Sequence, residues 1–198
     1  NNTTHFSVMD KAGNRVAATL SINYPFGSGF VPAGTGVLLN DEMDDFSIKP
    51  GTPNVYGLVG GQANAIEAGK RMLSSMSPTF IETKEYIGVL GTPGGSRIIS
   101  MVLLGILDAE QGYTPESWVN LPRYHHQYLP DVIQHEPGTF KDGMRAKLKE
   151  KGHQLKSVGR QYGNMHAILW DKKSNTLMAA SDRRGSGLAI VETVGINE

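Results

Sequence analysis

An apolar stretch that directly follows a glycine-rich turn constrains the fold of this chain more than any other part of its sequence. Residues 98–107 are almost all aliphatic or methionine, and they predict a helix over residues 96–109. Because this helix is apolar nearly all round, we expect it to be buried between layers. A strand predicted over residues 86–90 precedes it, with the glycine turn between them. The chain must therefore build a layered domain of helices and strands.

Strands are predicted on both sides of this unit. Residues 4–9 and 15–23 form a predicted hairpin, because Asp, Gly and Asn in the connection are all turn residues. The remaining predicted elements are strands over 37–39, 79–82, 165–170 and 176–180 and helices over 115–120 and 141–151. Strands first, helices next and strands again indicate one α+β domain over residues 1–198, with mostly antiparallel pairing.

The balance of charge and the absence of cysteine exclude several classes of function. The chain has 19 basic and 19 acidic side chains, so no net charge attracts it to nucleic acid or anionic lipid. Without cysteine there are no disulfide scaffolds, zinc fingers, thiol nucleophiles or iron–sulfur clusters. The longest apolar run, residues 98–107, is far shorter than the roughly 20 residues that span a bilayer. No basic stretch precedes an apolar one near residue 1, so we expect no signal peptide in this sequence.

Histidine and serine patterns argue against two common catalytic centres. Adjacent residues of a strand point to opposite faces, so His125 and His126 cannot converge on one metal, and no third ligand stands at helical spacing. We expect neither a metal nor a cofactor. The Gly-x-Ser-x-Gly elbow of the α/β-hydrolases is also absent. The basic and aromatic tract 123–128 is interpreted as structural, because acidic residues follow it and the overall charge is zero.

Three segments have the chemistry to bind the charged parts of a substrate. Gly94 and Gly95 leave backbone amides unpaired at the positive end of the predicted helix, which suits an anion or an oxyanion. The serines of segment 74–77 could donate to a carboxylate, and the acidic run 42–45 could hold an ammonium group. Each segment has a simpler alternative: a tight strand-to-helix turn, a serine turn and a solvated acidic turn, respectively.

The segment 49–61 combines chain-breaking residues with apolar side chains. Its prolines and glycines predict a long loop, whereas its aliphatic residues and Tyr56 need apolar contacts. This composition is common in a lid over a site. It fits an ordinary surface loop over the edge of a core equally well.

Seven short motifs, taken in order, point to a known family. They are Thr-Thr-His-Phe-Ser-Val-Met-Asp (3–10), Gly-Asn (13–14), Ser-Ile-Asn (21–23), Phe-Gly-Ser-Gly (26–29), Leu-Asn-Asp-Glu-Met-Asp-Asp-Phe (39–46), Leu-Ser-Ser-Met-Ser-Pro (73–78) and Pro-Gly-Gly-Ser-Arg (93–97). Together they resemble the small subunit of γ-glutamyltranspeptidase, a heterodimeric amino-terminal-nucleophile hydrolase. The resemblance covers residues 3 to about 182. It implies the four-layer αββα sandwich of that superfamily, completed by a large subunit.

The resemblance implies that Thr3 is the catalytic nucleophile, because the mature small subunit of the family begins with this threonine. Its hydroxyl attacks the γ-carbonyl of a γ-glutamyl amide while its free α-amine, with a pKa of about 7.7–8.0, accepts the proton. By the same resemblance, Gly94 and Gly95 line the oxyanion hole and Ser21 hydrogen-bonds the nucleophile. Ser21 and Asn23 fall on the same, more polar face of the second predicted strand.

Further positions carried over from the family bind the glutamyl end of the substrate. Asn23, Glu42 and Asp45 bind its α-amino end, and Ser74 and Ser75 hold its α-carboxylate. These implied roles agree with the chemistry of the residues, because carboxylates suit an ammonium and hydroxyls suit a carboxylate.

The lid and two departures from the family pattern complete the comparison. The segment 50–61 matches a lid that covers the site in many bacterial members, with Tyr56 as its gate. Two asparagines precede Thr3; if they remain attached, the chain is a precursor, a processing-defective form or an incompletely trimmed one. Position 42 is Glu where some bacterial members carry Gln, which adds negative charge near the ammonium pocket.

The resemblance therefore implies hydrolysis of γ-glutamyl amides such as glutathione or glutamine, and transfer to amino acid or peptide acceptors. A large subunit from the same precursor would supply an arginine for the donor carboxylate, and the implied location is periplasmic or secreted. Two alternatives stay open. One is a related acylase acting on cephalosporin, glutaryl or poly-γ-glutamate substrates, and the other is a catalytically silent assembly subunit or binding module.

Overall fold

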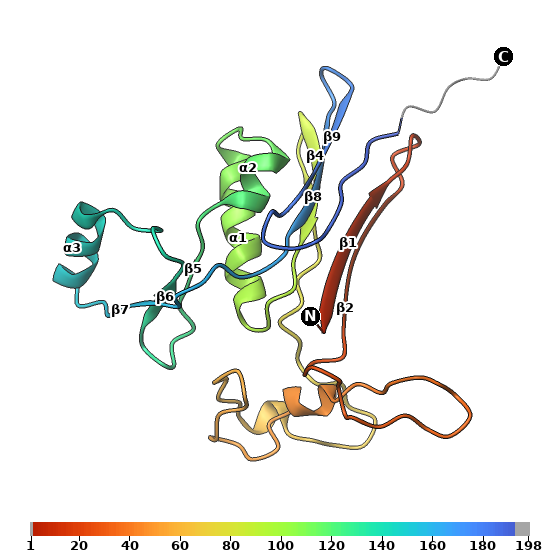
Figure 1. Cartoon of the computed structure of the whole chain (residues 1–198), viewed down its shortest axis with the longest axis vertical. Coiled ribbons are helices and arrows are strands. Elements are labelled where there is room, and N and C mark those ends of the chain that lie inside the picture. Colours follow the sequence, from red (N-terminus) through yellow and green to blue (C-terminus); the bar gives the residue numbers. More distant parts are fainter. Residues whose placement is uncertain (1, 193–198) are drawn as a thin grey trace.

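The computed structural model describes residues 2–192, with a four-stranded antiparallel sheet at its centre (Figure 1). The strands are β3 (Thr79–Glu82), β4 (Tyr86–Gly91), β8 (His166–Asp171) and β9 (Thr176–Ser181). Their order across the sheet is β3-β4-β8-β9. Residues 87–91 of β4 are all buried, because both faces of this central strand are covered.

A hairpin covers one face of the sheet, and two helices cover the other (Figure 1). The hairpin consists of β1 (Thr3–Met9) and β2 (Arg15–Ser21), paired so that Thr3 lies opposite Ser21. The helices are α1 (Arg97–Glu110) and α2 (Pro115–Asn120). Helices, sheet and hairpin are three layers of an αββα sandwich. The α+β class predicted from the order of the elements is confirmed.

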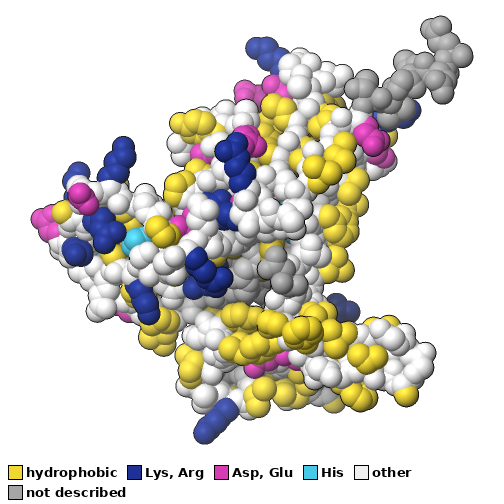
Figure 2. Space-filling view, in the orientation of Figure 1, with side chains coloured by type: hydrophobic (Ala, Val, Ile, Leu, Met, Phe, Trp, Pro, Cys, Tyr) yellow, Lys and Arg dark blue, Asp and Glu magenta, His cyan; other side chains and the backbone are white. Residues whose placement is uncertain are grey.

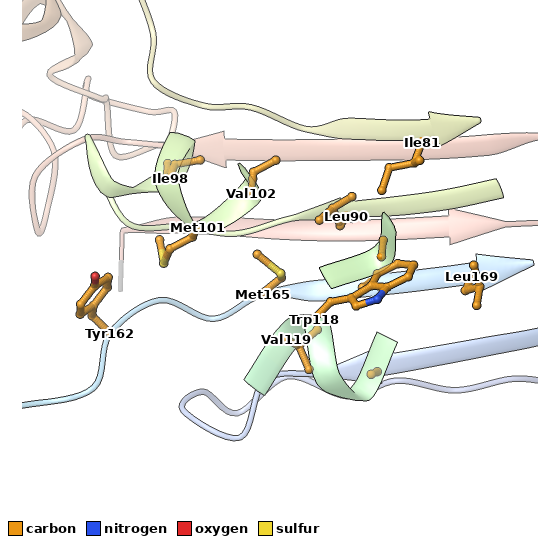
Figure 3. Close-up of a cluster of buried hydrophobic side chains, with 13 residues drawn as sticks. Ile81, Leu90, Ile98, Met101, Val102, Trp118, Val119, Tyr162, Met165 and Leu169 are labelled. Atoms are coloured by element: carbon orange, nitrogen blue, oxygen red, sulfur yellow. The ribbon is translucent and has the colours of Figure 1, made fainter. Parts of the chain in front are cut away.

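The hydrophobic core lies between the two helices and the sheet (Figure 3). α1 approaches β4 closely because Gly105 has no side chain; a Cβ there would lie 2.8 Å from Leu90 Cδ1. Trp118 of α2 is 1% exposed, and its indole N–H donates to the carbonyl oxygen of Tyr113 at 2.7 Å. This large side chain is therefore buried without an unsatisfied donor. The packing fixes where α1 begins, and with it the glycine turn that precedes the helix.

Two apolar surfaces of the described residues are open to solvent. On α1, Ile99, Leu103 and Leu107 form a stripe that is 56%, 53% and 48% exposed. The expectation that α1 is buried all round is therefore wrong: among the described residues 2–192, the sheet covers one side of the helix and the other side is open to solvent. The outer face of the hairpin is also apolar, and Figure 2 shows its hydrophobic side chains along one edge of the molecule. The exposed residues of this face are Phe6, Val8, Val16 and Leu20.

A smaller sheet and a third helix follow α2 (Figure 1). These elements are β5 (Tyr124–His125), β6 (Ile133–His135), α3 (Asp142–Glu150) and β7 (Leu155–Ser157). Strands of two or three residues have no periodic signal, so the sequence did not predict them. Arg123 is 1% exposed and pairs with Asp182 at 2.5 Å, in agreement with a structural role for the tract 123–128. Within residues 2–192, no helix has both the length and the apolarity needed to cross a bilayer.

The segment 22–78 is built mainly of loops. Its helical elements are two short 3₁₀ turns, η1 (Glu42–Asp45) and η2 (Gln62–Asn64). The strand predicted over residues 37–39 is absent. Leu39 makes two backbone hydrogen bonds across its own loop, one with Ser28 and one with Phe30, but these two bonds do not extend into a paired strand. Gly36, with a φ of 65°, breaks the extended backbone just before these residues, and Val37 is 56% exposed.

Candidate active site

The ends of β1 and β2, the glycine turn before α1 and the segment 22–78 meet around one cavity. Nine of the ten residues predicted for the site line it, and Gly94 is the exception. The lining residues are Thr3, Ser21, Asn23, Glu42, Asp45, Tyr56, Leu58, Ser74, Ser75, Met76, Gly95, Ser96 and Ile98. The fold thus brings together residues from segments that are far apart in the sequence.

Thr3 opens β1 and lies opposite Ser21, the last residue of β2. The two side chains meet, with Thr3 Oγ1 2.8 Å from Ser21 Oγ. Ser21 Oγ also accepts the backbone N–H of Asn23 at 2.9 Å, so its own proton is free to point at the Thr3 oxygen. β2 ends two residues earlier than predicted, because Asn23 adopts a φ of 65° and turns the chain into the cavity wall.

The end of the hairpin also holds the peptide bond between Asn2 and Thr3. The backbone N–H of Ile22 donates to the carbonyl oxygen of Asn2 at 3.0 Å. The side-chain amide of Asn2 donates to the carbonyl oxygen of Asn23. The carbonyl next to Thr3 is therefore already polarised by a hydrogen bond.

Gly94 and Gly95 connect β4 to α1 through backbone conformations that favour glycine. Their φ angles are 151° and 59°. A Cβ on Gly94 would clash with the side chain of Met101, and one on Gly95 would lie 3.0 Å from the Tyr56 ring. Within residues 2–192 neither amide N–H donates a hydrogen bond, so both are available at the positive end of α1. The turn is tight, as the simpler interpretation holds, and it also presents free amides.

The 3₁₀ turn η1 brings Glu42 and Asp45 to the cavity, with Asp44 beside them. Burial, followed by the neighbouring charges of Glu42 and Asp44, raises the pKa of Asp45 to about 6. Glu42 Oε1 is buried and has no hydrogen-bond partner among the described residues. This acidic group therefore differs from a solvated turn, and it is suited to receive the positive charge of a ligand.

Tyr56 reaches over the cavity from the loop 50–61. Its hydroxyl donates to the carbonyl oxygen of Asn23 at 3.4 Å, and its ring stacks on Tyr24 with the centroids 6.2 Å apart. The ring also lies against Gly95. Burial and the nearby Tyr24 raise the pKa of the Tyr56 hydroxyl above its usual value. One side chain thus links the loop to two walls of the cavity.

Ser74 and Ser75 form another part of the lining. Ser74 Oγ accepts the backbone N–H of Met76 at 3.1 Å, which is the serine turn of the simpler interpretation. Because this bond uses only a lone pair, the hydroxyl proton of Ser74 can still be donated to a ligand. In Ser75 the backbone carbonyl oxygen accepts a hydrogen bond from the Ser77 hydroxyl at 3.1 Å. The hydroxyl proton of Ser74 is therefore available to a carboxylate, and Ser75 adds a second serine to the same lining.

Four lining residues were not predicted from the sequence: Leu58, Met76, Ser96 and Ile98. The three apolar ones can cover the methylene groups of a ligand, and no sequence pattern distinguishes them. Ser96 could have been found, because it directly follows Gly95 at the predicted anion site. The described residues contain no group of three His, Cys, Asp or Glu side chains placed to hold a metal ion.

Comparisons with known sequences identify relatives of this chain. The γ-glutamyltranspeptidase family model matches residues 1–192. The glutathione hydrolase proenzyme of Pseudomonas aeruginosa is 47% identical over 193 residues, which cover 96% of this chain and 34% of the relative. The glutathione hydrolase proenzyme of Escherichia coli (strain K12) is 46% identical over 187 residues, which cover 93% of this chain and 32% of the relative. The chain thus spans about a third of the length of these relatives.

A comparison with solved structures finds the same family as the comparison of sequences. A crystal structure of acivicin-inhibited γ-glutamyltranspeptidase matches with a TM-score of 0.86 and 43% sequence identity. The match covers 93% of this chain and 100% of the solved chain. On the family model, the sequence identity and the shared fold, this chain belongs to the γ-glutamyltranspeptidase family.

Proposed function

We propose that this chain carries the catalytic centre of an enzyme that cleaves γ-glutamyl amides such as glutathione and glutamine. The γ-glutamyl group passes to Thr3 and then to water or to the amine of an amino acid or peptide acceptor. One observation carries the proposal: a single cavity combines a threonine hydroxyl paired with a serine, a glycine amide and two carboxylates. Within residues 2–192 the amide donates no hydrogen bond, the carboxylates pair with no cation, and Glu42 Oε1 is buried without a hydrogen-bond partner. Membership of the family supports it, since the relatives are named glutathione hydrolases.

Thr3 acts as the nucleophile and, through its own α-amine, as the base. A hydroxyl becomes an effective nucleophile when a base removes its proton, and an α-amine with a pKa of about 7.7–8.0 suits this task. In this chain the nitrogen belongs to the Asn2–Thr3 peptide bond. The Thr3 hydroxyl must therefore first attack the Asn2 carbonyl carbon. The Asn2–Thr3 C–N bond then breaks, which frees the α-amine and leaves Asn2 as an ester on the Thr3 oxygen, and water hydrolyses this ester to free the hydroxyl. Ser21, 2.8 Å from Thr3 Oγ1, orients the hydroxyl for both reactions.

The charged groups of the γ-glutamyl donor, the amide substrate that is cleaved, are bound by different parts of the cavity. The amides of Gly94 and Gly95 receive the negative charge that develops on the γ-carbonyl oxygen. Carboxylates bind the α-ammonium group, and hydroxyls bind the α-carboxylate. The side chains with these roles come from the segment 22–78: Asn23, Glu42 and Asp45 for the ammonium, and Ser74 and Ser75 for the carboxylate. Tyr56 and the loop 50–61 cover the bound donor as a lid.

A large subunit from the same precursor completes the enzyme in this proposal. The chain spans only about a third of relatives that are named proenzymes. The outer face of the hairpin and the outer stripe of α1 are apolar and exposed, which suits surfaces that a second subunit covers. The arginine expected from that subunit would pair with the donor carboxylate beside the two serines. A periplasmic or secreted location belongs to the same proposal.

The test compares Thr3→Ala with Thr4→Ala in the full precursor. Thr4 is the neighbouring residue, but its side chain is exposed, on the opposite face of β1. Thr3→Ala should leave the precursor uncut, form no covalent adduct with a glutamine-like electrophile and lose at least about 10⁴-fold in turnover of a γ-glutamyl anilide. Thr4→Ala should keep all three properties. Intact mass spectrometry reads the cleavage and the adduct, and amide cleavage retained by Thr3→Ala would overturn the proposal.

A further inference from the structure

One side chain outside the residues assigned above joins the cavity wall to the loop that covers it. Gln127 lies after β5 and is half-buried. Its Oε1 accepts from Ser96 Oγ at 2.7 Å and from His125 Nε2 at 2.7 Å. Its Nε2 donates to the carbonyl oxygens of Tyr56 and Leu129, each at 3.0 Å. All four hydrogen-bonding positions of the amide are therefore filled.

These partners fix the orientation of the amide. The two carbonyl oxygens can only accept, so the group that faces them must be the NH₂ of Gln127. Because Gln127 Oε1 can only accept, His125 Nε2 carries a proton, and His125 Nδ1 accepts from Ser100 Oγ at 2.5 Å. Burial lowers the pKa of His125, in agreement with a neutral ring. The hydrogen bonds thus run in one direction, from α1 through His125 and Gln127 to the loop.

The bonds of Gln127 reach both sides of one contact at the cavity. The ring of Tyr56 lies against Gly95, and Ser96 is the residue that follows Gly95. Gln127 therefore holds the backbone of Tyr56 and the hydroxyl of Ser96 together. The loop backbone also packs directly on the amide, because a Cβ on Gly57 would lie 3.3 Å from Gln127 Nε2.

We propose that Gln127 anchors the loop 50–61 over the cavity, so that retention of the donor depends on the N–H groups of its side-chain amide. The inference deepens the proposed function and rests on it. Gln127 acts through Tyr56 and not on the substrate, so it is a positioning residue. The bonds of Asn54 Oδ1 to the loop backbone stay within the loop. Within residues 2–192, the polar contact outside the loop that Tyr56 keeps without Gln127 is the 3.4 Å bond of its hydroxyl to the carbonyl oxygen of Asn23.

The substitution Gln127→Glu separates the two ends of this side chain. Glutamate can still accept from Ser96 and His125, but it has no N–H and places a carboxylate oxygen against the Tyr56 carbonyl. In the processed enzyme we expect KM for a γ-glutamyl anilide to rise about tenfold while kcat changes less than about threefold. Amide hydrogen exchange across residues 50–61 should become faster by a similar factor.

The matched control is Gln111→Glu. Gln111 is an exposed glutamine at the end of α1, and its Nε2 donates to the carbonyl oxygen of Leu107 at 3.3 Å. The same chemical change is made there, far from the loop 50–61 along the chain. We expect neither KM nor the exchange of the loop to change in this variant.

Each outcome decides the proposal. Loop exchange that is unchanged in Gln127→Glu, or that rises equally in the control, would overturn it. If the loop exchanges faster in Gln127→Glu but the unmodified enzyme does not turn over γ-glutamyl amides, the role of Gln127 in holding the loop is supported and the proposed function is contradicted. The two hypotheses can therefore fail separately. If Gln127→Glu does not fold, Gln127→Met is measured in the same way. Failure of both variants to fold would contradict the proposal, because Gln127 would then be part of the core and not an anchor of the loop.

Discussion

The two halves of the candidate site are held in place by different kinds of structure. Thr3 and Ser21 lie at the end of a paired hairpin, and the glycine turn connects a buried strand to a packed helix. The residues proposed to bind the glutamyl end lie in the segment 22–78, which is fixed by turns and side-chain hydrogen bonds. In the proposed function, the core therefore places the reacting atoms, whereas recognition depends on loops that local turns and hydrogen bonds hold in place.

This division predicts a kinetic signature. An interaction made only with the transition state affects kcat, and an interaction made equally with the bound substrate affects KM. Substitutions in the strand and turn half should therefore lower kcat. Substitutions in the loop half should weaken the binding of donors that carry the matching charge.

The largest effect among further substitutions is expected for Gly94→Ala. The added Cβ would clash with Met101 at a φ of 151°, so the backbone amide must rotate away from the oxyanion position. We expect kcat for a γ-glutamyl anilide to fall about 10²- to 10³-fold with a small change in KM. Gly143→Ala is the control, because a Cβ there would meet nothing within 4 Å. A loss confined to KM would show that this turn acts in substrate binding, as the loop half is proposed to do.

The next largest effect is expected for Asp45→Asn, in the loop half. A hydrogen bond between charged partners stabilises by about 1.5–3 kcal/mol, so kcat/KM for a γ-glutamyl anilide should fall about 10- to 100-fold. A glutaryl anilide lacks the α-amine, and its kcat/KM should change less than about twofold. Equal losses with the two donors would contradict the assigned ammonium site. Efficient use of the glutaryl donor by the unmodified enzyme would favour the related acylase.

The fold was predicted best where side chains face the core. The bounds of α2 and β3 agree with the prediction, and α1 begins one residue later than expected. Residues 37–39 were predicted as a strand because they are apolar, yet they lie in an exposed loop, and apolar character alone does not report burial. The short strands β5 to β7 form by pairing with one another. Each is too short to show an alternation of apolar and polar residues, so the sequence did not predict them.

The site was predicted through chemistry and family resemblance together. The hairpin turn and the alternation of β2 placed Ser21 on the polar face, which also carries Thr19 and turns inward. The acidic run and the serines had plausible local alternatives, and only the resemblance assigned them to one substrate. Gln127 was not predicted, because its partners come from distant segments and no spacing connects them.

A pH profile with two donors separates the contribution of Asp45, in the loop half, from that of Thr3, in the strand half. kcat/KM reports the free enzyme, in which the pKa of Asp45 is about 6 and only its ionised form attracts an ammonium. From pH 6 to pH 5, kcat/KM for a γ-glutamyl anilide should therefore fall about fivefold more than kcat/KM for a glutaryl anilide, whose fall of about tenfold reports only the α-amine of Thr3. A glutaryl anilide should lack the limb of Asp45. Both donors should show a limb at about pH 7.7–8.0, where the α-amine of Thr3 becomes neutral. Loss of the lower limb in Asp45→Asn would confirm its origin, and its persistence would assign it to another group.

The smallest effect is expected for Ser74→Ala, at the exposed edge of the loop half. The change removes one neutral donor to the carboxylate and the serine turn with Met76, so KM should rise about two- to fivefold with kcat unchanged. Ser28→Ala is the control, because Ser28 is also exposed and forms a similar local turn but does not line the cavity. A rise in KM specific to Ser74→Ala indicates direct contact with the donor. An equal rise in both variants would mean that KM depends on the general order of the segment 22–78, and the loop half would then act through its flexibility more than through its individual hydroxyls.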